Sequence, residues 1–345
     1  EATAGELAAV DGERGEVILA PDPATLAEYQ ARVARERQER ERRAALRELP
    51  AVTTDGARVE LFANIGAPGE VQRALANGAE GIGLFRTEFL FIERAELPGE
   101  EEQVAAYRAV AEGMSGRPVV IRTLDVGGDK PVPGIAAEPE LNPFLGVRGL
   151  RLTLRHPALF RTQLRAVLRA ATVGDIWLMF PMVTTVADVR AARAALDAAA
   201  AELRAERIAH RAALPLGIMI EVPAAALAAE RLIREVDFFS LGTNDLVQYT
   251  LAVDRTNADL AAAYSPLDPA VLRLIELAVA AAGSAGKPVA VCGELAGDPA
   301  AIPLLIGLGL RELSMTAARI PEAKELIRGL SARDAAETAR RAFTP

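Results

Sequence analysis

Short apolar runs recur along most of this chain, and a stretch with helical spacing of apolar positions follows each of them. Helical patterns include Ala187–Arg211, Ala224–Arg234 and Val271–Ala282. Eight apolar strands that alternate with helical segments predict a parallel (β/α)8 barrel of the TIM type rather than a doubly wound sheet. The eight predicted strands are Val59–Ile65, Gly81–Phe85, Pro118–Leu124, Ile176–Phe180, Leu216–Glu221, Phe238–Leu241, Pro288–Cys292 and Arg311–Ser314.

The first fifty residues follow a different pattern. A turn at Asp11-Gly12 and a strand over Glu16–Leu19 form a piece too small to bury a core. The stretch Ala24–Leu49 is dense in Arg and Glu, with i,i+4 pairs such as Glu39 with Arg43, and predicts a solvated helix. A coiled-coil surface is the alternative, but sustained heptads are missing. We expect a linker helix over residues 21–50 and the barrel over residues 51–345.

Composition excludes several classes of protein. The formal net charge of the 345 residues is −8, which disfavours nucleic acid as a partner. Cys292 is the single cysteine, so an intrachain disulfide framework is excluded. No apolar run approaches the roughly 20 residues that cross a bilayer, and the first residues lack the pattern of a secretory signal. We therefore expect a cytoplasmic protein that does not insert into membranes.

Polar residues gather at one end of the predicted strands. In barrels of this kind, catalytic side chains lie where strands end and the following loops begin. The residues at these ends, or just after them, are Arg86, Arg122, Glu221, Asn244, Asp245 and Cys292. Their recurrence at the same end of five strands predicts a shared site at the barrel mouth.

The arginines suggest a ligand that carries phosphate and carboxylate groups. Guanidinium groups bind both through forked, charge-assisted hydrogen bonds. Salt-bridged surface arginines are the alternative, which is weaker for Arg122 because a charge that closes an apolar strand needs a partner. The candidates are Arg86, Arg122, Arg148 and Arg255.

Two acidic residues follow neighbouring strands. Glu221 caps one and Asp245 lies just past the next, an arrangement typical of Mg²⁺, which takes few protein oxygens. The alternative is one helix cap and one ion pair. Cys292 could be a small core residue or could exchange a proton with a substrate. His156 and His210 are widely separated and are interpreted as structural, so zinc and iron are not indicated.

Six blocks of sequence together resemble the C-terminal half of Enzyme I of the phosphoenolpyruvate:sugar phosphotransferase system. The resemblance runs from about residue 10 to the end, with the blocks in family order. The blocks are GLFRTEFLF (83–91), RTLDVGGDK (122–130), NPFLGVRG (142–149), GIMIEVPAA (217–225), FFSLGTNDLVQYTLAVDR (238–255) and VCGELAGDP (291–299).

The resemblance implies a role for each matching residue. Phosphoenolpyruvate (PEP) would be bound by Arg86, Arg122, Arg148, Arg255 and Asn244, with Lys130 on the phosphate side. Glu221 and Asp245 would ligate Mg²⁺. Cys292 would deliver a proton to the methylene carbon, and phosphoryl transfer to a histidine would release pyruvate, with Arg122 and Arg255 stabilising charge. Family members dimerise through this barrel, which implies a homodimer.

One departure from the family is informative. The motif of the phosphorylated histidine, on a separate swivelling domain, does not occur here, and residues 1–20 resemble the last strand of that domain. The chain would bind PEP but require the acceptor domain, and through it the histidine-containing phosphocarrier protein, to start the sugar cascade. Two alternatives are the equivalent domain of a pyruvate phosphate dikinase or PEP synthase, and a PEP-sensing dimerisation module without turnover.

Overall fold

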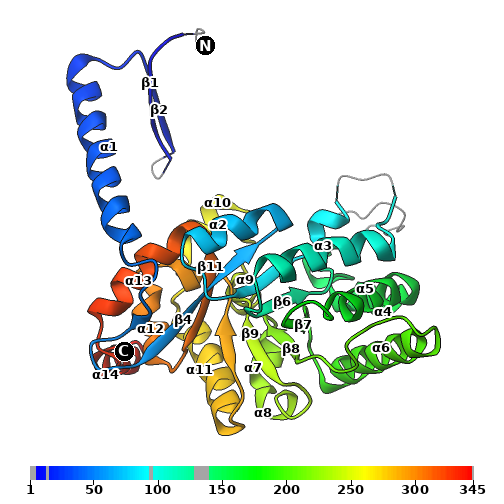
Figure 1. The fold of residues 1–345 in the computed structure, drawn as a ribbon. Helices are drawn as coiled ribbons and strands as arrows, with labels where there is room; N and C mark the ends of the chain where they lie inside the picture. The colour runs from blue at the N-terminus through cyan, green and yellow to red at the C-terminus, as the bar shows by residue number, and fades with distance from the viewer. Residues whose placement is uncertain (1–4, 13–14, 93–95, 128–139, 344–345) are drawn as a thin grey trace. The chain divides into compact units, whose positions relative to one another are not determined.

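A computed structural model describes residues 5–12, 15–92, 96–127 and 140–343 of the chain, which divides into two compact units, Glu1–Glu48 and Leu49–Pro345. The first unit contains an antiparallel hairpin of β1 (Ala8–Asp11) and β2 (Glu16–Leu19), followed by helix α1 (Pro23–Ala44) (Figure 1). Asp22 caps α1 by accepting hydrogen bonds from the N–H groups of Ala24 and Thr25 at 2.9 and 2.8 Å.

The sequence predictions for this unit were partly wrong. Only the second strand of the hairpin was expected, because the first is short and begins with two alanines, which have weak strand propensity. Helix α1 ends at Ala44 rather than Leu49. The expected pair between Glu39 and Arg43 is present at 3.7 Å.

The second unit is a closed barrel of eight parallel strands, which confirms the predicted fold class. Each strand pairs with the next in sequence, and β11 pairs with β4 to close the ring (Figure 1). A two-residue strand, β3 (Ala51–Val52), adds to β4 in the antiparallel direction. The barrel strands are β4 (Arg58–Ile65), β5 (Ile82–Arg86), β6 (Val119–Arg122), β7 (Ile176–Phe180), β8 (Leu216–Ile220), β9 (Phe238–Leu241), β10 (Val289–Val291) and β11 (Glu312–Thr316).

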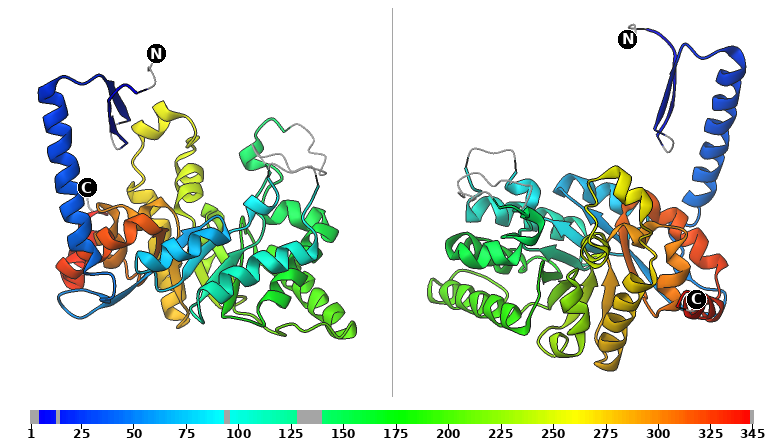
Figure 2. Two further views of the ribbon diagram at one scale, coloured as in Figure 1. Left: turned by 45° about the horizontal axis from the view of Figure 1, so that its top comes forward. Right: turned by 180° about the vertical axis from the view of Figure 1, so that it is seen from behind.

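Helices surround the strand ring (Figure 2). The α-helices of this unit are α2 (Val71–Ala76), α3 (Glu100–Gly113), α4 (Leu150–Arg155), α5 (Pro157–Ala170), α6 (Val186–Ala205), α7 (Pro223–Leu227), α8 (Ala229–Leu232), α9 (Thr243–Leu251), α10 (Ala258–Ala263), α11 (Pro269–Ser284), α12 (Ala301–Gly307), α13 (Ile320–Gly329) and α14 (Ala332–Arg341). Short 3-10 turns follow several strands, namely η1 (Pro68–Glu70), η2 (Glu88–Leu90), η3 (Pro143–Leu145), η4 (Glu294–Gly297) and η5 (Ala317–Arg319).

Two helix predictions needed correction. The helix expected over Ala187–Arg211 ends at Ala205, because Arg207 adopts a left-handed φ of 59° and the Ile208 N–H bonds back to the Leu203 carbonyl. The helix expected over Ala224–Arg234 is divided at Ala228 into α7 and α8. Nothing in the residue pattern marks that second break.

Two apolar cores hold the barrel together. The larger lies between strands and helices and includes outward-facing side chains such as Leu61, Ile121 and Leu313. The smaller is built from alternate residues that face the inside of the ring. It consists of Leu84, Val120, Met179, Met219, Phe238 and Cys292, with Trp177 packed against it. Because each strand has apolar residues on both faces, the sequence shows continuous rather than alternating runs.

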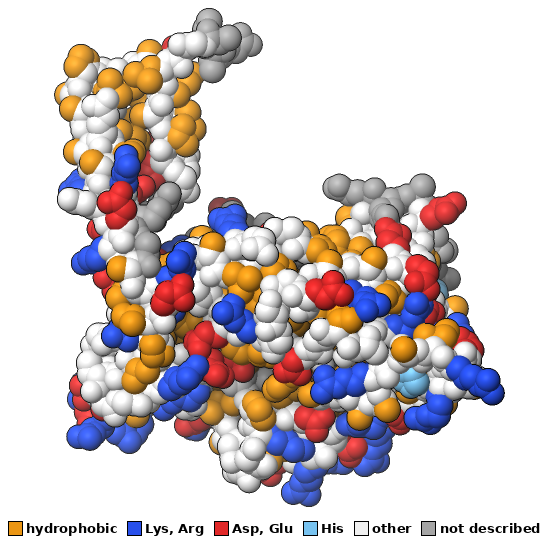
Figure 3. Space-filling view, in the orientation of Figure 1, with side chains coloured by type: hydrophobic (Ala, Val, Ile, Leu, Met, Phe, Trp, Pro, Cys, Tyr) orange, Lys and Arg blue, Asp and Glu red, His pale blue; other side chains and the backbone are white. Residues whose placement is uncertain are grey.

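The surface carries charges of both signs. Figure 3 shows basic and acidic side chains interspersed over the face of the barrel in view. Among the described residues, no helix has the length and apolar character needed to cross a bilayer.

Candidate functional site

A cavity of about 720 Å³ lies at the end of the barrel where the strands terminate. It collects every predicted site residue that the structure describes: Arg86, Arg122, Arg148, Glu221, Asn244, Asp245, Arg255 and Cys292. Lys130, predicted to contact phosphate, lies outside the described residues. Six of these eight residues were predicted from their positions at strand ends, and Arg148 and Arg255 were predicted as anion-binding arginines.

Arg122 is held by two carboxylates. Its Nη2 lies 2.9 Å from Glu88 Oε1 and its Nη1 lies 2.9 Å from Asp125 Oδ2. Burial by itself would lower the pKa of this guanidinium, but the charges of Glu88 and Asp125 outweigh that effect and raise the pKa. The buried Nε of Arg122 has no hydrogen-bond partner among the residues that the structure describes. One donor on a fixed cation is thus left for a ligand.

Arg148 connects two of the acidic residues. Its Nη2 lies 3.1 Å from Asp125 Oδ2, and its Nη1 lies 3.1 Å from Asp245 Oδ1. Nη1 also donates to the Tyr249 hydroxyl at 3.2 Å, while that hydroxyl donates to the Phe144 carbonyl at 2.5 Å. The guanidinium is thereby fixed between the loop after β6 and helix α9.

The remaining two arginines are more open. Arg255 Nη1 lies 3.6 Å from Asp245 Oδ2, and its side chain is 38% exposed. Arg86, the last residue of β5, is exposed, and its side chain forms no hydrogen bond or ion pair with the part of the chain that the structure describes. An unpaired guanidinium that faces a cavity is an anion-binding group.

Three buried carboxylates converge beside these arginines. Oxygen atoms of Asp125, Glu221 and Asp245 all lie within 4.8 Å of one another. Burial, followed by the charges of Asp125 and Asp245, raises the pKa of Glu221 to about 8. Three carboxylates this close together suit a divalent cation such as Mg²⁺, because the ion would offset the repulsion between their negative charges.

The backbone near Glu221 is arranged around its carboxylate. Met182 has a φ of 54°, a conformation that non-glycine residues rarely adopt, and its N–H donates to Glu221 Oε1 at 2.6 Å. Gly242 lies on the other side, where an added Cβ would be 2.9 Å from Glu221 Oε2. Backbone strain of this kind occurs at sites where the surrounding structure requires one position for a side chain.

Asn244 and Asp245 lie in the first turn of α9, and Asn244 contacts the neighbouring loop. Its Nδ2 donates to Glu294 Oε1 at 3.2 Å, and its Oδ1 accepts from the Glu294 N–H at 2.9 Å. This reciprocal pair joins the loops after β9 and β10.

Cys292 lies at the floor of the cavity, directly after β10. Its thiol is buried, and burial raises its pKa to about 11. The thiol therefore keeps its proton at neutral pH, which suits a proton donor better than a nucleophile.

Sequence reasoning missed three residues of the site. Glu88 and Asp125 follow the ends of β5 and β6, and both ion-pair with Arg122. The same strand-end rule could have found them. Tyr249 lies one helical turn after Asp245 on α9 and had no signal of its own, because its role depends on contacts with Arg148 and Phe144.

Comparison with known proteins identifies the family. The family described as "PEP-utilising enzyme, PEP-binding domain" matches residues 40–332. Three similar curated proteins are phosphoenolpyruvate-protein phosphotransferases. That of Geobacillus stearothermophilus is 50% identical over 332 residues, which cover 96% of this chain and 57% of the relative. Those of Staphylococcus carnosus strain TM300 and Streptococcus equinus are each 47% identical over 342 residues, which cover 99% of this chain and 60% and 59% of the relative, respectively. This chain thus spans less than two thirds of the length of each. The cavity is formed within the matched region, and the chain belongs to the family of PEP-utilising enzymes, of which it carries the PEP-binding domain.

Proposed function

We propose that this chain is the PEP-binding, Mg²⁺-dependent part of a phosphoenolpyruvate-protein phosphotransferase. The phosphoryl group passes to a histidine on another domain, and pyruvate is released. The observation that carries the proposal is the convergence of four arginines, two at the ends of β5 and β6 and two in the segments after β6 and α9, with three buried carboxylates in one cavity. Relatives at 46–50% identity are phosphoenolpyruvate-protein phosphotransferases, which supports the same activity.

The arginines bind and orient the substrate. Arg122 and Arg148 are fixed by ion pairs and offer preorganised positive charge, whereas Arg86 and Arg255 are more exposed and can adjust to the ligand. Asn244 would contact the substrate beside them. Preorganised donors cost little reorganisation as charge moves during phosphoryl transfer.

The charge balance of the cavity favours a metal. Four arginines and five acidic residues line the described part of the cavity, so it does not attract an anion by net charge alone. Glu221 and Asp245 would hold Mg²⁺, with Asp125 beside them. When bound, the ion would neutralise charge on the phosphate.

The Cys292 thiol supplies the proton that the methylene carbon of PEP receives. As the P–O bond of PEP breaks and a P–N bond forms to the acceptor histidine, the enolate oxygen keeps the electron pair. The Cys292 thiol then protonates the methylene carbon to give pyruvate, and solvent restores the thiol proton. A buried thiol with a raised pKa holds that proton until the enolate forms.

The first unit fits a connection to the acceptor domain. Several apolar side chains of the hairpin are exposed: Leu7, Val10, Val17 and Leu19. We assign residues 1–20 to the edge of the phosphohistidine domain and residues 21–50 to the linker helix, with the barrel over 51–345. The further assignments are a homodimer, a cytoplasmic location and the histidine-containing phosphocarrier protein as the next acceptor.

Transfer in trans tests this function. The remaining N-terminal part of the Geobacillus stearothermophilus relative is supplied as a separate chain together with phosphate-labelled PEP and Mg²⁺. Label on its histidine, with equimolar pyruvate, is expected only when this chain is present. Binding of PEP by calorimetry without any transfer or pyruvate would favour the sensing module instead.

A further inference from the structure

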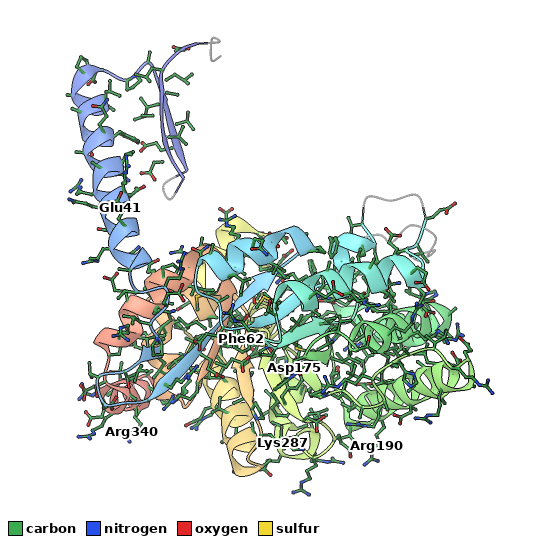
Figure 4. The ribbon with its side chains drawn as sticks, in the orientation of Figure 1. Glu41, Phe62, Asp175, Arg190, Lys287 and Arg340 are labelled. Carbon is green, nitrogen blue, oxygen red and sulfur yellow. The ribbon has the colours of Figure 1, made fainter. Side chains whose placement is uncertain are left out.

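A separate cavity, of about 300 Å³, opens at the opposite end of the barrel, where the strands begin. Its lining comes from the first residues of β4, β6, β7, β9, β10 and β11, and none of these residues belongs to the PEP-binding cavity. The interior of a TIM barrel is normally filled by side chains, so a cavity at this end is unusual. Two residues labelled in Figure 4 help to locate this end of the barrel: Phe62 lies on β4, and Asp175 directly precedes β7.

The walls of this basal cavity are aromatic. Rings of Trp177 and Phe238 are 5.1 Å apart with an interplanar angle of 56°, and Phe62 contributes a third ring. Glycines make room for two of them. A Cβ at Gly81 would lie 2.8 Å from the Phe62 ring, and a Cβ at Gly217 would overlap the Phe238 ring. These rings therefore have defined positions rather than filling space loosely.

The charges at the basal cavity are mainly negative. Arg58 pairs with Glu80 at 2.6 Å and lies 3.9 Å from Glu60. Glu312, on β11, also lines the cavity, and its carboxylate forms no hydrogen bond or ion pair with any described residue. One arginine thus faces three carboxylates, and the carboxylate of Glu312 has no counterion among the described residues.

Glu312 is in an unfavourable position for a carboxylate. It keeps some contact with solvent, yet burial raises its pKa to about 7, with a further contribution from the charge of Glu60. A cation in the cavity would remove this penalty. Aromatic faces attract the same kind of ligand through their quadrupoles.

We propose that the basal cavity binds a small organic cation, a primary ammonium or guanidinium ion with an apolar body, with its charge on Glu312 and its body against Trp177 and Phe238. The apolar body matches the three rings, and the charge matches the unpaired carboxylate. A hydrated metal ion fits less well, because Arg58 already pairs with Glu80 and lies near Glu60, and the rings supply no oxygen ligands beside Glu312. The ligand is a free small molecule, since the binding groups lie inside the strand ring.

The chain offers a direct probe of this cavity. Trp177 is its only tryptophan, so intrinsic tryptophan fluorescence reports on the basal cavity alone. We would titrate the full chain with n-butylammonium at pH 8, where Glu312 is ionised, and with 1-butanol as the neutral isostere. Saturable change is expected with the ammonium ion and not with the alcohol.

A Glu312→Gln variant keeps the shape of the wall and removes the charge. Its affinity for n-butylammonium is expected to fall roughly tenfold to a hundredfold, the loss of one charged hydrogen bond, while its affinity for PEP stays unchanged. The proposal is overturned by an absent or non-saturable response, by an equal response to 1-butanol, or by unaltered affinity in Glu312→Gln. Binding of Nα-acetyl-lysine methylamide without binding of n-butylammonium would also overturn it, because a partner's side chain would then be the ligand.

Discussion

The guanidinium of Arg148 lies 3.1 Å from a carboxylate oxygen of Asp245 and 3.1 Å from a carboxylate oxygen of Asp125. One cation therefore links the loop after β6 to the first turn of α9. This link joins the two segments that carry Asp125 and Asp245, so the relative positions of these two carboxylates depend on the guanidinium of Arg148.

Arg148→Lys tests that link. An ammonium group cannot reach both carboxylates with the geometry of a fork, so one acid loses its partner. We expect a loss of roughly 1–3 kcal/mol in the free energy of unfolding and weaker Mg²⁺ binding. Chemical denaturation and calorimetry measure the two effects. The control is Arg190→Lys, an exposed residue paired with Glu235, which should change neither. Equal effects in both variants would contradict the bridging role.

Arg122→Ala should weaken PEP binding. The variant removes a fixed cation whose Nε has no partner in the described part of the chain, and the expected loss is roughly 1.5–3 kcal/mol. Titration calorimetry with PEP and Mg²⁺ gives the value, and Arg108→Ala on the exposed face of α3 is the control. If affinity is the same for Arg122→Ala and for the parent chain, Arg122 does not bind substrate.

Metal binding should depend on pH through Glu221. Without metal the pKa of this group is about 8, so at pH 7 most molecules carry the proton and Mg²⁺ must displace it. Apparent affinity should therefore rise with pH up to about 8 and then level off. Calorimetry in two buffers of different ionisation enthalpy measures the released proton. Glu221→Gln should abolish the release, and a pH-independent affinity in the parent chain would refute this account.

Stability should change in the opposite direction over the same range. The folded protein binds a proton at Glu221 that the unfolded chain loses near pH 4.5, so this residue lowers the free energy of unfolding as pH rises from about 4.5 to 8. Chemical denaturation of Glu221→Gln without metal should show a free energy of unfolding that lacks this fall between pH 4.5 and 8. An identical pH profile in parent and variant would show that the pKa of Glu221 is not raised.

Cys292→Ala should separate binding from turnover. The thiol is a neutral, buried group at the floor of the cavity, so PEP affinity should be unchanged while release of pyruvate in trans becomes slower. Stopped assays with the separate acceptor domain follow both phosphohistidine and pyruvate. Normal pyruvate release by the variant would make Cys292 a core residue only.

Gly293→Ala should distort the site without removing any functional group. A Cβ at this position would overlap the Thr243 hydroxyl and come within 2.7 Å of the Thr243 backbone nitrogen, at the start of α9. We expect a loss of roughly 1–3 kcal/mol in unfolding free energy and weaker Mg²⁺ binding. Gly283→Ala, in α11 with no atom within 4 Å of the added Cβ, should be neutral or slightly stabilising. Similar melting temperatures for the two variants would argue against the steric account.

Sequence alone determined the barrel and eight of the charged and polar residues that line its mouth. Strands buried on both faces produce continuous apolar runs, and parallel strands bring their ends to one side, so Arg122, Glu221 and Asp245 could be grouped without coordinates. Only the tertiary structure decided which acids pair with which arginines, because Glu88, Asp125 and Tyr249 acquire their roles from contacts across loops. The basal cavity was equally invisible in sequence. Its volume depends on how the side chains of Trp177, Phe238 and Glu312 pack at the end of the barrel where the strands begin. Packing of this kind is decided in three dimensions and leaves no pattern in the sequence.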